Sequence, residues 1–157
     1  MNKITIMKSP IADTRSADHL ISLEELRQST TMHISDVRKA MNWFSKVLAW
    51  RGVRHDWTKV TFIREFYCQF SNAQKTGEWG TGWYDQIHIA KERHHLKDCC
   101  PEDVNLIDVL EMLCDCVMAG LARSGKYRDE EPDPEMLVKA YKNTVQLLID
   151  AVEIADA

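Results

Sequence analysis

The sequence predicts an all-α protein, a single-domain bundle of about six helices. Apolar residues recur at helical spacing over most of the chain, and no stretch shows convincing period-two alternation of apolar and polar residues. A chain of 157 residues can bury roughly two-thirds of its unfolded surface around one core. Since no repeat, low-complexity segment or long linker divides the chain, we expect one domain over residues 1–157 with its core in 30–122.

The expected helices begin after a partly irregular N-terminal segment, 1–21. Ser22 and Glu25 have the spacing of a capping box at the start of a short helix. Gly52 stands where the C-terminal cap of the second helix belongs, and Asp133 with Pro134 marks the start of the last one. In chain order, the expected helices span residues 22–28, 31–51, 58–74, 83–96, 102–122 and 134–154.

Composition and charge exclude several classes of protein. Apolar residues make up 45% of the chain and charged residues 28%, and no apolar run approaches the roughly 18 residues of a membrane span. The net charge of −4 disfavours a partner such as long nucleic acid, which needs a concentrated basic face. Because the first residues lack an apolar stretch of signal-peptide length, we expect a cytoplasmic protein. Exposed Trp or Met residues are compatible with a homodimer but do not require one.

Five cysteines are an odd number, and two of them lie inside an apolar helical pattern. This usage fits reduced thiols better than a disulfide framework. A zinc site built from the pairs Cys99-Cys100 and Cys114-Cys116 is disfavoured, because neither pair has CxxC spacing.

Asp115 is the only charged residue in the run MLCDCVM, residues 112–118. Burying an unpaired carboxylate costs several kcal/mol, so a cation or a hydrogen-bond donor must meet it. Asp108, Glu111 and Asp115 form an acidic stripe on one helix face, which indicates a polar cavity or a metal. For Asp108 and Glu111 alone, an ordinary solvent-exposed face is the favoured interpretation.

Histidines supply further candidate ligands. His33 lies one turn into a largely apolar helix, where a lone histidine is usually a satisfied core residue. His88 and His95, seven residues apart, would share a helix face, and His94 would point about 100° away. With the carboxylates, these nitrogens suit a divalent transition metal such as Mn, Fe, Co, Ni or Zn.

The motif HDWTK, with His55, Asp56 and Lys59, resembles the HDxxK form of the HD-domain superfamily. His33 on the preceding helix and Asp115 on a later one complete that resemblance over about residues 30–120. HDWTK, RHHLKD and VLEMLCDCV are also similar to segments of small uncharacterised bacterial and phage HD-like proteins. The resemblance implies an all-α bundle of the HD-domain type and, for most members, metal-dependent phosphohydrolase activity.

The resemblance also implies ligand sets for one or two metal ions. The residues it assigns to the first ion are His33, His55, Asp56 and Asp115. A second ion, bridged by Asp56, would use the three remaining candidates, His88, His94 and His95. Alternatively, His94 and His95 contact substrate phosphate or lie at the surface.

The expected reaction is hydrolysis of a phosphate ester or anhydride in a small nucleotide by a metal-activated water. Lys59 would neutralise charge on the phosphate, Arg93 and Lys97 would hold its other oxygens, and Glu111 would orient or deprotonate the water. Arg93 and Lys97 fit an ordinary solvated face equally well. The short interval between Asp56 and Asp115 favours a small substrate.

Two other functions fit the same residues. Some HD-fold proteins are mixed-valence di-iron oxygenases, whose ligand set of four His and two Asp this chain could supply. A metal-free protein that binds a nucleotide or a partner is the third alternative, which the intact HDxxK and the embedded Asp115 disfavour. Trp79, Trp83 and Tyr84, beside glycines in the loop before His88, could stack on a base or could simply pack on one another.

Overall fold

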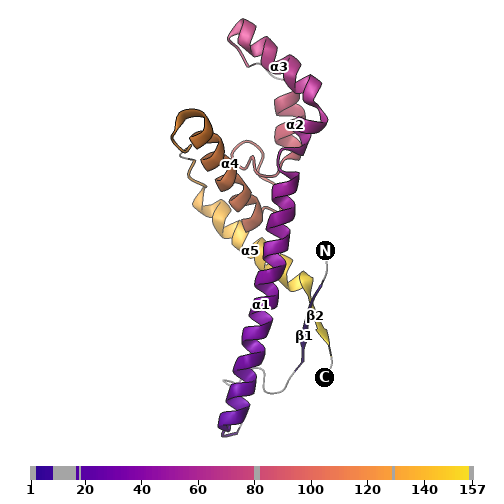
Figure 1. Ribbon diagram of the computed structural model, residues 1–157, viewed down its shortest axis with the longest axis vertical. Coiled ribbons are helices and arrows are strands. Elements are labelled where there is room, and N and C mark those ends of the chain that lie inside the picture. The colour runs from indigo at the N-terminus through magenta and orange to yellow at the C-terminus, as the bar shows by residue number, and fades with distance from the viewer. Residues whose placement is uncertain (1–2, 9–16, 18, 80–81, 129, 156–157) are drawn as a thin grey trace. The chain divides into compact units, whose positions relative to one another are not determined.

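The computed structural model is mostly helical, with 69% of the chain in helices and one two-stranded sheet (Figure 1). The all-α prediction is confirmed at this level. The residues described are 3–8, 17, 19–79, 82–128 and 130–155. The elements among them are β1 (Ile4–Met7), α1 (Leu23–Arg54), α2 (Trp57–Thr61), α3 (Ile63–Thr76), the π-helix η2 (Tyr84–Ile89), α4 (Leu106–Ser124), α5 (Pro134–Ala151) and β2 (Val152–Ala155).

The chain forms two compact units, to which α1 and α5 both contribute. The first unit contains residues 1–47 and 145–157, and the second contains residues 48–144. That the two make up one domain stays a prediction. Among the described residues, none of the helices combines the length and the apolar character that crossing a membrane requires.

The first unit contains the parallel pair of strands β1 and β2, which the sequence did not predict. Ile4 pairs with Val152 and Met7 with Ala155, and the two strands lie side by side in Figure 1. Each strand has only four residues, which is too short for a period-two pattern to stand out. β2 also directly follows α5, so the expected helix over 134–154 ends three residues early.

Helix α1 is a single helix where the sequence predicted two, so the break between 22–28 and 31–51 is wrong. The predicted capping box is confirmed, because Ser22 N–H donates to Glu25 Oε2 (2.8 Å) and Glu25 N–H donates to Ser22 Oγ (3.2 Å). The hydroxyl of Thr31 donates to the carbonyl of Arg27 (2.8 Å), which accommodates a polar residue inside the helix. Gly52 is a helical residue rather than a cap.

Helical spacing on α1 does not mean burial. Ile34, Val37 and Met41 recur as a helix face predicts, yet all three side chains are exposed. Trp43 and Val47 are the large apolar side chains of this helix that are buried. The expected homodimer stays a prediction.

In the second unit, α4 packs on the first half of α5. The buried cluster joins Leu96, Val104, Met112, Cys116 and Ala140. α4 begins after Asn105 rather than at residue 102, and α5 begins at Pro134, as predicted. The predicted helix over 58–74 is divided at Phe62, whose φ of −111° and ψ of 42° separate α2 from α3.

The predicted helix over 83–96 ends at residue 91, and most of it is a π-helix. His88 is the fifth residue of η2, while His94 and His95 lie in the turns that follow. The wider turn of a π-helix departs from the 3.6-residue period, so spacing on an ideal helix is not a guide to the directions of these side chains. π-helical turns occur frequently at functional sites. Gly80 and Thr81 of the preceding loop lie outside the described residues, as do 9–16 and 18 of the N-terminal segment.

Candidate metal centre

Asp56 occupies the sharp turn that joins α1 to α2. Its φ of 57° and ψ of 24° are left-handed, a conformation that Asp adopts more readily than most residues other than Gly. Lys59 Nζ lies 2.6 Å from Asp56 Oδ2. The other oxygen, Oδ1, has no hydrogen-bond partner among the described residues and lies 3.5 Å from His88 Nε2 and 3.7 Å from His94 Nε2. The turn therefore directs a free carboxylate oxygen at two imidazoles.

A buried chain of hydrogen bonds sets the tautomer of His88. The carboxylate of Glu92 can only accept, so the Thr58 hydroxyl donates its one proton to Glu92 Oε1 (2.7 Å). Thr58 Oγ1 must then accept from His88 Nδ1 (2.7 Å), which leaves the lone pair of His88 on Nε2. That nitrogen lies 2.8 Å from His95 Nε2 and faces Asp56. His88 is thus prepared as a ligand.

Burial keeps two of the imidazoles neutral. Burial, with the nearby charge of Lys59, lowers the pKa of His88 to about 3. Burial, together with His94 and Lys59, lowers the pKa of His95 to about 4. A neutral imidazole is the form that binds a metal, so both residues are ready as ligands at neutral pH.

His55 is surrounded by carboxylates. Its Nδ1 lies 3.1 Å from Glu111 Oε1, and its Nε2 lies 3.5 Å from Asp115 Oδ1 and 3.7 Å from Asp56 Oδ2. The contacts with Asp115 and Glu111 raise the pKa of His55 to about 10. The surrounding carboxylates therefore strongly stabilise the protonated, positively charged form of His55.

The same contacts act in the opposite direction on the carboxylates. The close contact with His55 lowers the pKa of Asp115 to about 2. Burial alone would raise the pKa of Glu111, but the contacts with His55 and His94 outweigh burial and lower it to about 2. Both carboxylates are ionised at neutral pH. The requirement that Asp115 meet a cation or donor is satisfied here by His55.

His94 lies between these two sets of residues. Its side chain is almost fully buried, and neither ring nitrogen has a hydrogen-bond partner among the described residues. Nδ1 faces Glu111 Oε1 at 3.3 Å, while Nε2 faces Asp56. Buried polar atoms without a partner are rare and costly, so their gathering here suits the binding of a cation.

Two groups of side chains could hold a metal ion. In each group the candidate ligand atoms lie within 4.8 Å of one another. The first, the histidine group, consists of Asp56, His88, His94 and His95, and the second, the carboxylate group, consists of His55, His94 and Glu111. Asp115 adjoins the carboxylate group through His55. The sequence predicted a site for a divalent transition metal. The residues that lie together here offer nitrogen and oxygen atoms suited to such an ion.

Asp108 is fully buried and links the elements around the site. Arg93 binds its carboxylate through two hydrogen bonds, Nε to Oδ1 (2.9 Å) and Nη2 to Oδ2 (2.7 Å), and Arg51 Nη2 contacts Oδ1. The N–H of Asn105 donates to Oδ2 (3.0 Å). The solvent-face interpretation is therefore wrong for Asp108. It is also wrong for Glu111, whose side chain is only 8% exposed.

This network also gives Arg93 a structural role. Besides Asp108, Arg93 binds the side chain and the carbonyl of Asp103 (2.9 and 3.1 Å). Its guanidinium thereby ties the turn before His94 to Asp103 and Asp108. A role of Arg93 in substrate binding stays a prediction.

A pocket of about 480 Å³ opens beside the histidine group. Asp56, His94, His95 and Asp115 line it, and so do four cationic side chains, Lys59, Lys97, Arg123 and Arg128. Lys97 is exposed and lies 3.8 Å from Glu130, so its role in substrate binding stays a prediction. Arg123 and Arg128 were not singled out in the sequence, because no motif connects them with HDWTK.

Aromatic residues form one wall of this pocket. Phe66, Phe70, Trp79 and Tyr84 line it, and the rings of Trp79 and Tyr84 pack edge to face at 5.4 Å. The ring of Trp83 instead stacks on that of His88, with ring centroids 5.6 Å apart and an angle of 21° between the ring planes. The aromatic loop therefore both packs on itself and faces the pocket.

A second, mainly apolar pocket of about 440 Å³ adjoins the carboxylate group. Ile107, Leu110 and Met118 are among its apolar lining residues, and His55, Glu111 and Asp115 line its polar part. Asp115 lines both pockets.

Most of the predicted ligands meet in the second unit, but His33 is not in either group. It is an exposed residue of α1 in the first unit. Its assignment as a ligand stays a prediction. Sequence reasoning missed Thr58 and Glu92, although Thr58 is part of HDWTK, because nothing local shows which distant side chain a buried hydroxyl will meet. All five cysteines are free thiols, and neither metal-ligand group contains one.

The chain belongs to DUF5662, a family of unknown function whose model matches residues 22–152. No curated protein and no solved structure matches it.

We expect Asp108→Asn to lower the free energy of unfolding by about 3 kcal/mol, because it leaves two guanidinium groups facing a neutral amide. Asp103→Asn is the matched control, since it removes a carboxylate from the same Arg93 at a site that is 79% exposed, and we expect a loss below about 1 kcal/mol. Urea denaturation of chelator-treated protein measures both. Equal losses would contradict the central role of Asp108.

We expect the stability of chelator-treated protein to be greatest near pH 6.5. Below that pH, His88 and His95 become protonated in the unfolded chain, whereas in the folded chain they stay neutral down to their pKa values of about 3 and about 4. The unfolded state therefore binds more protons, and stability falls as the pH falls. Above it, folded His55 retains a proton that the unfolded chain has lost, so stability falls as pH rises to about 10.

Urea denaturation across this pH range measures both slopes. His55→Gln should flatten the alkaline slope, whereas His33→Gln, at an exposed position, should leave both slopes unchanged. An alkaline slope that persists in His55→Gln would refute the assignment.

Proposed function

We propose that the protein is a metal-dependent phosphohydrolase that acts on a small nucleotide. The observation that carries this proposal is the set of buried, unpartnered ligand atoms beside a pocket lined by four cationic side chains, four carboxylates and four aromatic rings. The resemblance of HDWTK to the HD-domain superfamily supports the same chemistry and the HD type of helical bundle.

The histidine group would hold the first ion through Asp56, His88, His94 and His95. A neutral imidazole has one lone pair, so if His94 uses Nε2 for this ion, its Nδ1–H can donate to Glu111. His55, Glu111 and Asp115 would then hold a second ion in place of the proton that His55 carries in the metal-free protein.

A bound transition metal would lower the pKa of its water to about 7 and would polarise a phosphoryl oxygen. The protein's own residues supply the rest. Lys59, held by Asp56, lies at the edge of the pocket where it can neutralise charge that develops on phosphate. With a pKa of about 2, Glu111 stays ionised. It is therefore better suited to orient the attacking water than to accept and hold a proton from that water.

The pocket beside the histidine group matches the parts of a nucleotide. Arg123, Arg128 and Lys97 can bind phosphate oxygens, and the flat faces of Trp79 and Tyr84 can stack on a base. A volume of about 480 Å³ falls in the usual range for small-molecule sites and is too small for a long nucleic acid.

The apolar pocket favours a second candidate, a di-iron oxygenase. It places Ile107, Leu110 and Met118 beside the carboxylate group, where a less polar substrate could approach. Four histidines and the neighbouring carboxylates also suit iron. Iron content and oxygen consumption separate this function from hydrolysis.

We expect protein purified without chelator to carry up to two equivalents of a transition metal. His94→Ala should lose the ion of the histidine group, because it removes a buried ligand from both groups. Glu111→Gln should keep that ion, since an amide oxygen still accepts from His94, but should lose the second. Elemental analysis with protein concentration from amino-acid analysis measures this.

The matched control is His33→Ala, which tests the ligand that the resemblance implies. Retention of all metal in His33→Ala would remove His33 from the ligand set. Wild-type protein that stays empty after incubation with Mn, Fe, Co, Ni and Zn would contradict the metal centre and would favour the non-catalytic alternative.

We expect the metal-loaded protein to release phosphate, pyrophosphate or nucleoside from members of a panel of nucleoside mono- and triphosphates. Lys59→Gln should lower kcat/KM by about 100-fold, because it removes a cation next to the reacting phosphate. Lys75→Gln, an exposed lysine of α3 outside the pocket, should leave kcat/KM unchanged. No release by protein that contains metal, together with iron-dependent oxygen consumption, would replace hydrolysis by the oxygenase.

A further inference from the structure

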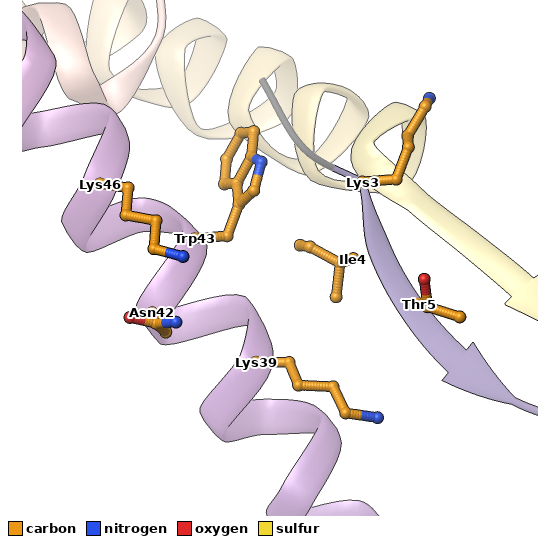
Figure 2. A pocket seen from close by; sticks show the side chains of 7 residues that line it. All are labelled: Lys3, Ile4, Thr5, Lys39, Asn42, Trp43 and Lys46. Carbon is orange, nitrogen blue, oxygen red and sulfur yellow. The ribbon is translucent and has the colours of Figure 1, made fainter.

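The first unit has a pocket of its own, of about 400 Å³, between β1 and α1. Figure 2 shows side chains of α1 facing those of the N-terminal strand across it. The residues that line it are Lys3, Ile4, Thr5, Lys39, Asn42, Trp43 and Lys46. None of them belongs to the candidate metal centre.

Trp43 forms the back of this pocket and carries an unused donor. The residue is only 8% exposed, and its indole N–H has no hydrogen-bond partner among the described residues. In Figure 2 the indole nitrogen is turned toward the side of the pocket formed by Lys3 and Ile4. An indole N–H can only donate, and a buried donor without an acceptor is costly. The nitrogen itself has almost no accessible surface, so an acceptor in the pocket reaches it by displacing the atoms that cover it.

The other polar side chains of the pocket are mainly donors too. Three are ammonium groups, and no carboxylate is among the lining residues. Lys39 contacts Asp36 (2.8 Å) and Lys3 donates to the carbonyl of Asp150 (2.5 Å), yet each ammonium has three N–H groups and so keeps donors for a ligand. For Lys46 the described residues show no ion pair or hydrogen bond. The pocket thus combines positive charge with an excess of donors.

We propose that this pocket binds a small organic anion through its phosphate or carboxylate group. The oxyanion would accept from Lys46, its charge shared with Lys3 and Lys39, and would accept from Trp43 Nε1–H once the atoms that cover this nitrogen move aside. The volume of about 400 Å³ exceeds what one oxyanion fills, and Ile4 and the Trp43 ring offer apolar surface to the rest of the ligand. This site is separate from the proposed catalytic one, so either can fail alone.

The test follows the indole N–H resonance of Trp43 in 15N-labelled full-length protein, with Trp43→Phe used to assign it. The probes are inorganic phosphate, succinate, adenosine 5′-monophosphate and uncharged adenosine. We expect a saturable shift with one or more of the anions and none with adenosine. Phosphate against succinate distinguishes the two oxyanion classes.

Lys46→Gln should weaken anion binding about tenfold, the loss of one charge-assisted hydrogen bond. Lys8→Gln is the matched control, because it removes an exposed lysine of the same unit that does not line the pocket. Both are surface positions, so folding does not decide the result. The proposal is overturned if no anion gives a saturable shift, if chloride at equal ionic strength gives the same shift, or if the two variants weaken binding equally.

Discussion

The buried carboxylate of Asp108 makes the contacts on which the arrangement of the candidate metal centre depends. It joins Arg51 near the end of α1, Arg93 in the turn after η2, and Asn105 at the start of α4. Each partner lies close in sequence to candidate ligands. His55 follows Arg51 by one turn, His94 and His95 follow Arg93 directly, and Glu111 and Asp115 follow Asp108 along α4. A single carboxylate thus fixes the three segments that must meet, and a carboxylate with no exposed surface tolerates little displacement of its partners.

A second constraint orients the ligands once these segments have met. The left-handed turn at Asp56 points a carboxylate oxygen inward, and the chain from Glu92 through Thr58 directs the lone pair of His88 toward it. Positive φ in a residue other than Gly costs free energy, as does the burial of Glu92. The surrounding hydrogen bonds sustain both. Such preparation of ligand atoms in advance is what a metal site of defined geometry requires.

The sequence predicted which residues gather at the candidate centre better than it predicted their geometry. HDWTK and the lone charge of Asp115 identified residues that do meet, because short motifs and a charge within an apolar run are local signals. The solvated interpretation of Asp108 failed because its partners, Arg51 and Arg93, lie far from it in sequence. η2 was missed because π-helical turns leave no mark on a 3.6-residue pattern. The strands were missed because each is four residues long and pairs with the opposite end of the chain.

Charge balance connects the number of ions with the substrate. At neutral pH the metal-free centre sets the carboxylates of Asp56, Glu111 and Asp115 against Lys59 and the protonated His55, which leaves one negative charge. One divalent ion in the histidine group would leave the proton on His55 and bring the balance to one positive charge. One ion in the carboxylate group alone would displace that proton and bring the balance to neutrality. With both ions the centre would carry two positive charges and would attract an anionic group most strongly. An anionic substrate therefore fits a centre whose histidine group is occupied, whereas a neutral ligand from the apolar pocket fits an ion in the carboxylate group alone.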